Sequence, residues 1–175
     1  MAKKKYTIEK IPAKTISYDS KRKRDRNNVY YIVIHYTGCS GDKARSNALF
    51  FKNWNTRSAG AHFFVDKEGI IVKSIAMNRT AWSVGGFFTQ ANGAGSLYKK
   101  ATNLNSVSIE LCDCVKGSNE AQEAAVEWLI KYIRKYCPNA TQVIRHWDVN
   151  GKCCPAPFTG KTNKKWTKFK NVIGA

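Results

Sequence analysis

Residues 145–157, which read RHWDVNGKCCPAP, constrain the fold more than any other stretch of the chain. They contain two metal-ligating side chains, His146 and Cys154, and a third such side chain, His35, follows the distant apolar run 29–34. Two imidazoles and a thiolate suit zinc and leave a fourth position free for water. The fold therefore has to bring His35 beside His146, and the open position indicates chemistry rather than a structural metal.

The residues between His146 and Cys154 predict where Lys152 lies. An Asn-Gly turn signal at residues 150–151 lets the chain leave the metal and return. Prolines 155 and 157 keep the returning leg out of a helix, and in an extended leg Lys152 points the way Cys154 points. Taken singly, a histidine that ends a buried strand is more often a core residue, and a Cys beside a Cys is more often inert packing or half of a disulfide. Their combination with a lysine at a fixed offset favours the metal site.

Hydrophobic periodicity predicts one α/β domain. At 175 residues and 43% hydrophobic, the chain is long enough for one core and too short for two ordinary domains. We expect strands at residues 29–35, 61–65, 70–75, 107–112 and 142–146, and helices at 43–53 and 119–136. Their order predicts a mixed central β-sheet flanked by helices, with His35, Glu110 and His146 near one rim of the sheet.

Positive charge is concentrated at the two ends of the chain. Net charge is +18, from 30 Lys and Arg against 12 Asp and Glu. We expect a basic N-terminal arm at residues 1–28, a catalytic domain at 29–160 and a basic tail at 161–175 that packs on the domain through a terminal helix or turn. Such a charge attracts a polyanion, either nucleic acid or an anionic cell wall.

No run reaches the roughly 18 apolar residues that a membrane span needs. The basic start of the chain is not followed by an apolar core of secretory length, so we expect synthesis in the cytoplasm without a signal peptide. In that reducing compartment, the six cysteines are better explained as thiols and a metal ligand than as a disulfide framework. Pairing among the other five stays open if the protein later leaves the cell.

Two further features are candidates for function. Residues 80–100 are rich in glycine and aromatic side chains, which predicts a binding loop with Trp82, Phe87 and Phe88 as substrate contacts; a satellite core under a long loop is equally compatible. Glu110 lies in mid-strand on the face opposite an apolar set, where a solvated sheet face is the simpler explanation.

Four strings of the sequence carry a family resemblance: IVIHYTG, AHFFVDKEG, NSVSIEL and RHWDVNGKCCPAPF. They resemble the type 2 family of zinc-dependent N-acetylmuramoyl-L-alanine amidases, which includes phage endolysins and is related to the peptidoglycan recognition proteins. The resemblance runs from about residue 30 to residue 158, and the segment that joins the second histidine to the cysteine is its most specific part.

The resemblance implies a role for each matched residue. His35, His146 and Cys154 are expected to bind Zn²⁺, Glu110 to act as general base and Lys152 to stabilise the oxyanion. The expected reaction is hydrolysis of the amide between N-acetylmuramic acid and L-alanine in peptidoglycan, by a monomeric endolysin that acts on the cell wall after release.

The chain departs from the family at two positions. Ala61 stands where some members have an active-site tyrosine, and Ser83 stands where a histidine follows the loop tryptophan. Catalysis should therefore depend on Glu110, and His62 is expected to be a packing or supporting residue rather than a ligand.

Two other functions compete with hydrolysis. The alternative is a non-catalytic peptidoglycan-binding module, against which the retained Lys152 and Cys154 argue. Specific nucleic-acid binding is motivated by the charge, but the chain has no Cys-x-x-Cys finger and no RNP-like string. Measured zinc content would separate an enzyme from a binding module.

Overall fold

A mixed six-stranded sheet forms the centre of the computed structural model, which describes residues 6–175. The first five residues, which hold three lysines of the expected basic arm, lie outside the described residues. The strands are β1 (Ile8–Lys10), β2 (Tyr31–Tyr36), β3 (Phe63–Val65), β4 (Ile71–Lys73), β5 (Ser106–Leu111) and β6 (Gln142–Arg145). The helices are α1 (Ala44–Asn53), α2 (Glu120–Tyr136), α3 (His146–Asn150) and α4 (Lys164–Val172).

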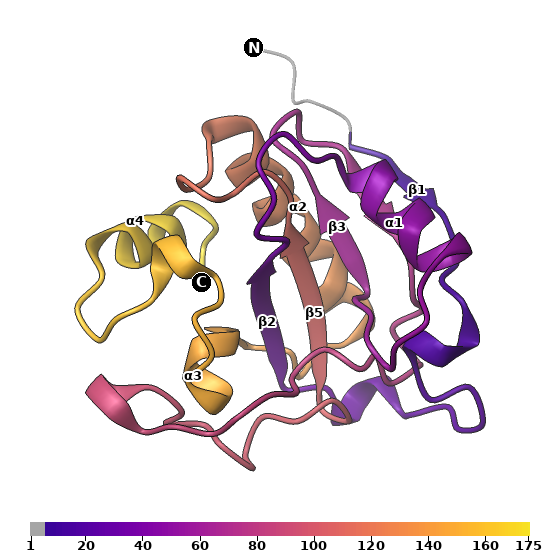
Figure 1. Cartoon of the computed structure of the whole chain (residues 1–175), viewed down its shortest axis with the longest axis horizontal. Helices are drawn as coiled ribbons and strands as arrows, with labels where there is room; N and C mark the ends of the chain where they lie inside the picture. The colour runs from indigo at the N-terminus through magenta and orange to yellow at the C-terminus, as the bar shows by residue number, and fades with distance from the viewer. Residues whose placement is uncertain (1–5) are drawn as a thin grey trace.

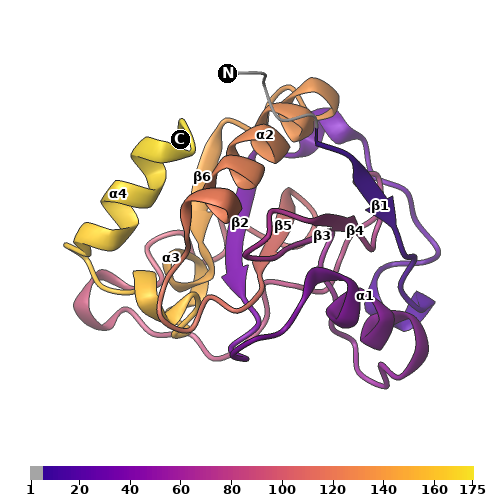
Figure 2. The same ribbon diagram turned by 90° about the horizontal axis from the view of Figure 1, so that it is seen from above.

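The strand order across the sheet is β1-β4-β3-β5-β2-β6, as Figures 1 and 2 show. Only the β3–β4 pair is antiparallel among these neighbours; the other pairs are parallel. The expected mixed sheet flanked by helices is confirmed. The seven expected strands and helices are present with ends within two residues of those predicted, because each has either a continuous apolar run or a clear helical stripe.

Helices cover the two faces of the sheet unequally. Phe63 and Phe64 are adjacent in β3 and so point to opposite faces. Phe63 packs in the core cluster that includes Leu129 and Ile133 of α2, whereas Phe64 packs with Ala44 and others from α1. Figure 2 shows α2 on one side of the sheet and α1 and α3 on the other. His35 and Glu110 belong to the same face as Phe64, because these three residues are paired across β2, β5 and β3.

Capping explains where α2 begins. The Asn119 side chain accepts a hydrogen bond from the Gln122 backbone N–H at 3.0 Å, as expected for an N-cap. Glu120 and Glu123 lie in the first turn and Arg134 and Lys135 in the last, which complements the helix dipole.

The N-terminal segment packs on the domain more closely than expected. Ile8–Lys10 forms an edge strand, β1, that pairs in parallel with β4. Arg24 donates hydrogen bonds to the carbonyls of Met77, Asn103, Leu104 and Ser106. A three-residue edge strand is too short to give a periodic signal, so the sequence pattern did not reveal it.

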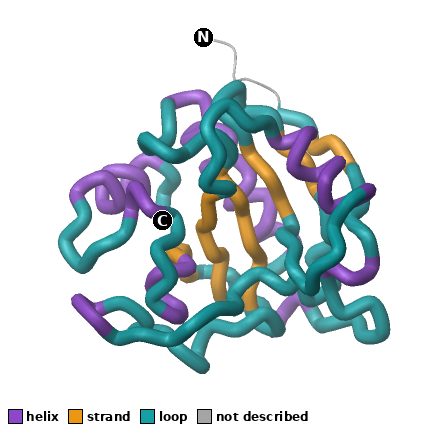
Figure 3. Tube along the Cα trace, in the orientation of Figure 1, coloured by secondary structure: helices purple, strands orange, loops and turns teal. Residues whose placement is uncertain are grey.

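The C-terminal tail forms a helix that lies beyond the β6 edge of the sheet (Figures 1 and 2). Trp166 and Phe169 are buried against the main core, whereas Val172 is 41% exposed and Ile173 is buried in its place. Long loops join the elements along the rim near α3 (Figure 3). Within residues 6–175, no helix is long and apolar enough to cross a membrane.

Candidate functional site

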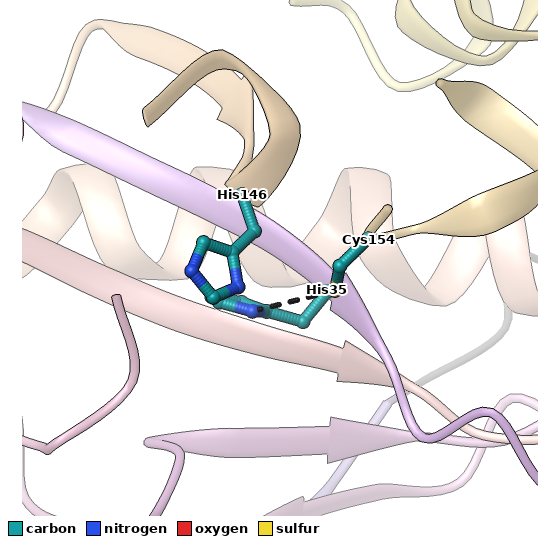
Figure 4. A group of neighbouring side chains, drawn as sticks. All are labelled: His35, His146 and Cys154. Carbon is teal, nitrogen blue, oxygen red and sulfur yellow. Dashed lines mark hydrogen bonds between the residues drawn. The ribbon is translucent and has the colours of Figure 1, made fainter. Parts of the chain in front are cut away.

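Three buried side chains, His35, His146 and Cys154, meet at one end of the central strands (Figure 4). Each offers one possible ligand atom, and these atoms all lie within 4.8 Å of one another. The Cys154 Sγ atom is 3.7 Å from His35 Nδ1. The sequence placed these three residues at one metal centre, and the fold brings them together.

Parallel pairing explains how residues so distant in sequence converge. Ile34 of β2 is paired with Arg145 of β6, so His35 and His146 follow at the carboxyl ends of adjacent parallel strands. At this point β6 gives way to α3, which was not expected. Asp148 caps the start of α3: its Oδ2 atom accepts the Arg145 N–H at 2.7 Å and its Oδ1 atom is 2.7 Å from the Arg145 guanidinium.

The ring nitrogens of the two histidines indicate a missing partner. The Nε2 atom of His146 lies 2.9 Å from the Gly85 carbonyl oxygen and donates to it, which leaves Nδ1 as the free lone pair. Within residues 6–175, His146 Nδ1 and His35 Nε2 are buried and have no hydrogen-bond partner. Buried polar atoms are rarely left unsatisfied, so a ligand or ion at this place is chemically reasonable.

Electrostatics keep both imidazoles neutral, which is the form that binds metals. Burial, together with the charge of Lys152, lowers the pKa of His146 to about 4, although the hydrogen bond to Gly85 opposes this shift. Burial, followed by the neighbouring His146 and Lys152, likewise holds the pKa of His35 well below its usual value. Burial raises the pKa of the Cys154 thiol to about 12, so this thiol has to lose its proton when a metal binds. This donor set fits zinc.

Glu110 lies next to the three side chains rather than on a solvated sheet face. It is paired with His35 across β2 and β5 in parallel register, so the two side chains share a face. Among the described residues, its buried Oε2 atom has no hydrogen-bond partner. Burial, opposed by the charge of Lys152 and reinforced by that of Asp42, raises the pKa of Glu110 to about 7. A carboxyl with this pKa can exchange a proton near neutral pH.

Lys152 lies near the cluster, but the expected extended leg is wrong. The Cys154 N–H donates to the Lys152 carbonyl at 2.7 Å, which closes a tight turn. Lys152 is exposed, whereas Cys154 is buried. The Lys152 charge still acts on His35, His146 and Glu110.

The aromatic loop, defined here as residues 82–98, docks on α3. The backbone N–H groups of Thr89, Gly95 and Leu97 donate to the carbonyls of Asn150, Trp147 and Asp148, at 2.8 to 2.9 Å. The bonds from Leu97 and Thr89 satisfy the Asp148 and Asn150 carbonyls at the end of the short helix, and the Trp147 carbonyl also accepts the Gly151 N–H.

The three predicted substrate contacts in this loop differ in their surroundings. Phe87 is 97% exposed, whereas Trp82 is half-buried. Phe88 stacks on Tyr98 with ring centroids 3.8 Å apart. Phe88 therefore has a packing role within the loop, and Phe87 has none.

Two polar residues near the site, Asn150 and Arg24, have no recognisable sequence signal. Asn150 was seen only as part of a turn, yet it is 2% exposed and hydrogen-bonds on three sides. Arg24 was assigned to a basic arm, yet its Nη2 atom is 3.0 Å from His62 Nε2. His62 itself lies outside the metal cluster and binds Ser108, as expected for a packing residue. What distinguishes these residues is that they are polar and buried, and their burial can be recognised only from the structure.

Comparison with known proteins finds a single family for most of the chain. The family model described as N-acetylmuramoyl-L-alanine amidase matches residues 25–157. The amidase CwlA of Bacillus subtilis (strain 168) is 28% identical over 148 residues, which is 83% of this chain and 49% of that protein. The amidase XlyB of the same strain is 31% identical over 146 residues, or 82% of this chain and 41% of that protein. The chain thus spans about half the length of the curated relatives it matches.

Solved structures agree with this similarity. A mutant endolysin from Bacillus subtilis has a TM-score of 0.71 at 25% identity and covers 97% of this chain and 100% of its own. The catalytic domain of XlyA has a TM-score of 0.70 at 26% identity, and the match covers 96% of this chain and 99% of that domain.

Proposed function

The chain belongs to the N-acetylmuramoyl-L-alanine amidase family, and from this premise we propose that it hydrolyses the amide between N-acetylmuramic acid and L-alanine of peptidoglycan. The observation that supports this reaction most directly is the buried His35, His146 and Cys154 cluster with Glu110 beside it. We further propose that the protein acts on the bacterial cell wall as an endolysin. A binding module without activity has no need of a buried carboxyl whose pKa is about 7.

We assign the metal site to His35, His146 and Cys154. When bound there, zinc supplies a Lewis acid that polarises a carbonyl and lowers the pKa of water from 15.7 to about 7. The protein contributes two neutral imidazoles and orients one of them through the Gly85 carbonyl.

Two side chains move or stabilise charge in the proposed reaction. Glu110 accepts the proton of the attacking water and delivers it to the leaving amine of L-alanine, a task suited to a carboxyl with a pKa of about 7. Lys152 stabilises the oxyanion that forms when the amide carbonyl is attacked, an effect whose loss typically costs about 10²-fold or more.

The aromatic loop supplies the proposed substrate contacts. Phe87 presents a free ring that can pack on a sugar face or a peptide side chain, and Trp82 and Phe88 lie on the same loop. The backbone bonds from Thr89, Gly95 and Leu97 hold this part of the loop beside α3, the helix that begins with His146.

Digestion of purified muropeptides, followed by mass analysis, tests the reaction. We expect a glycan product with a free lactyl carboxylate and a peptide product that begins with a free L-alanine amine. Recovery of intact muropeptides after they have bound to the zinc-loaded protein would indicate a binding module instead.

Adjacent cysteines provide a matched test of the metal site. Cys154 is 5% exposed within the cluster, whereas its neighbour Cys153 is exposed. Cys154→Ala should abolish zinc binding and activity because it removes one of three protein ligands. Cys153→Ala should keep both, as measured by metal analysis and muropeptide digestion. The opposite pattern would mean that the site is assigned one residue out of register.

A further inference from the structure

Asn150 lies buried at the end of α3 and connects three segments around the candidate site. Its Nδ2 atom donates to the Gly85 carbonyl at 2.7 Å, and its Oδ1 atom accepts the Lys152 N–H at 3.1 Å. Its own carbonyl accepts the Thr89 N–H at 2.9 Å. One side chain and its backbone thus join the aromatic loop to the turn that carries Lys152.

The Gly85 carbonyl links Asn150 to a proposed metal ligand. This oxygen accepts hydrogen bonds from both Asn150 Nδ2 and His146 Nε2, at 2.7 and 2.9 Å. A carbonyl oxygen has two lone pairs and can serve both donors. Gly85 is exposed and lies outside regular secondary structure, so the Asn150 bond holds its carbonyl where His146 can reach it.

Two glycines, Gly86 and Gly151, let the aromatic loop approach the end of α3 closely. A Cβ atom at Gly86, where φ is +123°, would lie 3.1 Å from Asn150 Nδ2. A Cβ atom at Gly151, where φ is +84°, would lie 2.2 Å from Thr89 Cγ2 and 2.6 Å from its carbonyl oxygen. Both glycines therefore allow the loop and the end of α3 to approach closely.

We propose that Asn150 is a positioning residue that orients His146 for zinc through the Gly85 carbonyl. The side chain of Asn150 hydrogen-bonds Gly85 and Lys152 rather than the ring nitrogens or the thiol that would hold the metal. While the carbonyl is held, His146 keeps its proton on Nε2 and offers Nδ1 to the metal. This inference rests on the proposed zinc site, and it adds a coupling between the aromatic loop and the metal ligand.

The test compares Asn150→Ala with Asn55→Ala. Both asparagines are 2% exposed and both donate through Nδ2 to loop carbonyls, which for Asn55 are those of Arg57 and Ala59. Zinc affinity is measured by competition with a chelator, beside the thermal midpoint of each protein. We expect Asn150→Ala to weaken zinc binding by about 10- to 100-fold, the usual effect of losing a partner behind a metal ligand, and Asn55→Ala to leave it unchanged.

A spectroscopic measurement reports on the histidine itself. In the zinc-free wild type, ¹⁵N NMR of the His146 ring should show the proton on Nε2, and in Asn150→Ala it should show a mixture of tautomers. Wild-type zinc affinity and a wild-type His146 spectrum in Asn150→Ala would overturn the proposal. Equal loss of affinity in Asn55→Ala would also overturn it.

A second variant keeps the test decisive if Asn150→Ala does not fold. Asn150→Asp keeps the volume and the acceptor for Lys152 but loses the donor to Gly85. Its added negative charge attracts a cation, so weaker zinc binding there reports the lost hydrogen bond; unchanged or tighter binding would count against the proposal. If wild-type protein itself binds no zinc, the proposed metal site fails, and the NMR measurement still tests the orientation of His146.

Discussion

The three histidines of the chain differ in how their ring nitrogens are satisfied. His62 Nδ1 accepts the Ser108 N–H at 3.1 Å, and its Nε2 lies 3.0 Å from the Arg79 carbonyl, to which it donates. By contrast, His35 and His146 each keep one buried nitrogen without a partner among residues 6–175. All three pKa values are lowered by burial, so the pairing of the nitrogens, rather than the pKa, separates a structural histidine from a candidate ligand.

The pH dependence of stability should report on His62. Burial, and then the charge of Arg24, lowers its pKa from 6.5 to about 3. A histidine whose folded-state pKa is depressed contributes stability above the unfolded value of 6.5 and loses it as the pH falls toward 3. The loss is up to about 1.4 kcal/mol for each pH unit in that window.

We expect His62→Gln to reduce this pH dependence, because its amide can accept from Ser108 and donate to Arg79 without titrating. Between pH 6.5 and 4.5, the free energy of unfolding should fall by about 2–3 kcal/mol less than in the wild type, as measured by denaturant titration. Both proteins are compared in the same metal state, so that His35 and His146 contribute equally. Parallel pH profiles would contradict the prediction.

Glu110 offers a test of the proposed chemistry that leaves the ligands untouched. Glu110→Gln preserves shape, so zinc content and fold should survive while turnover falls by roughly 10² to 10⁴, the expected loss for a positioned general base. KM should barely change. Near-normal turnover would remove Glu110 from the mechanism, whereas loss of zinc in the same preparation would show that it supports the metal.

At the scale of elements, the sequence was most informative where burial is continuous. The strand that carries His35 and the capped helix α2 have strong apolar patterns, and both were predicted closely. Among the strands and α-helices of the described residues, β1 and α3 were not expected, and they have three and five residues. Such short elements are determined by what they pack against, here β4 and the aromatic loop, which local sequence does not reveal. The role of Asn150 was hidden for the same reason.

We expect a change in the aromatic loop at Phe87 to affect substrate binding without affecting the stability of the protein. Phe87 is 97% exposed and buries almost nothing, so Phe87→Ser should leave the thermal midpoint unchanged. If its ring packs on substrate, KM should rise several-fold at nearly constant turnover. The control is Val172→Ser, which removes an exposed apolar side chain from α4. An unchanged KM in Phe87→Ser would show that Phe87 does not contact substrate. The aromatic residues of the loop would then serve only to pack Phe88 against Tyr98.

For the whole molecule, charge should govern adsorption to the wall. The net charge is +18, and α4 buries Trp166 and Phe169 while exposing Lys164, Lys165 and Lys168. Binding to intact walls should weaken steeply with salt, since the Debye length falls from about 10 Å at 0.1 M to about 3 Å at 1 M.

A soluble, uncharged substrate fragment should show no such salt dependence. Replacing the three exposed lysines of α4 by Gln should weaken adsorption to walls at low salt and leave turnover of the fragment unchanged. Salt-insensitive adsorption of the wild type would indicate a specific carbohydrate or peptide pocket instead.

The parallel pairing of β2 with both β5 and β6 also dictates when the centre can form. Tyr31 at the start of β2 pairs with Ser106 of β5 and with Gln142 of β6. Both of these neighbouring strands are therefore synthesised long after β2. Such distant pairings form slowly, because a long loop has to close first. Because synthesis proceeds from the N-terminus, His35 leaves the ribosome before Glu110, and Glu110 leaves it before His146 and Cys154. The proposed metal site consequently cannot form before β6 and the segment that carries Cys154 have docked, so an unfinished nascent chain lacks the complete set of three ligands.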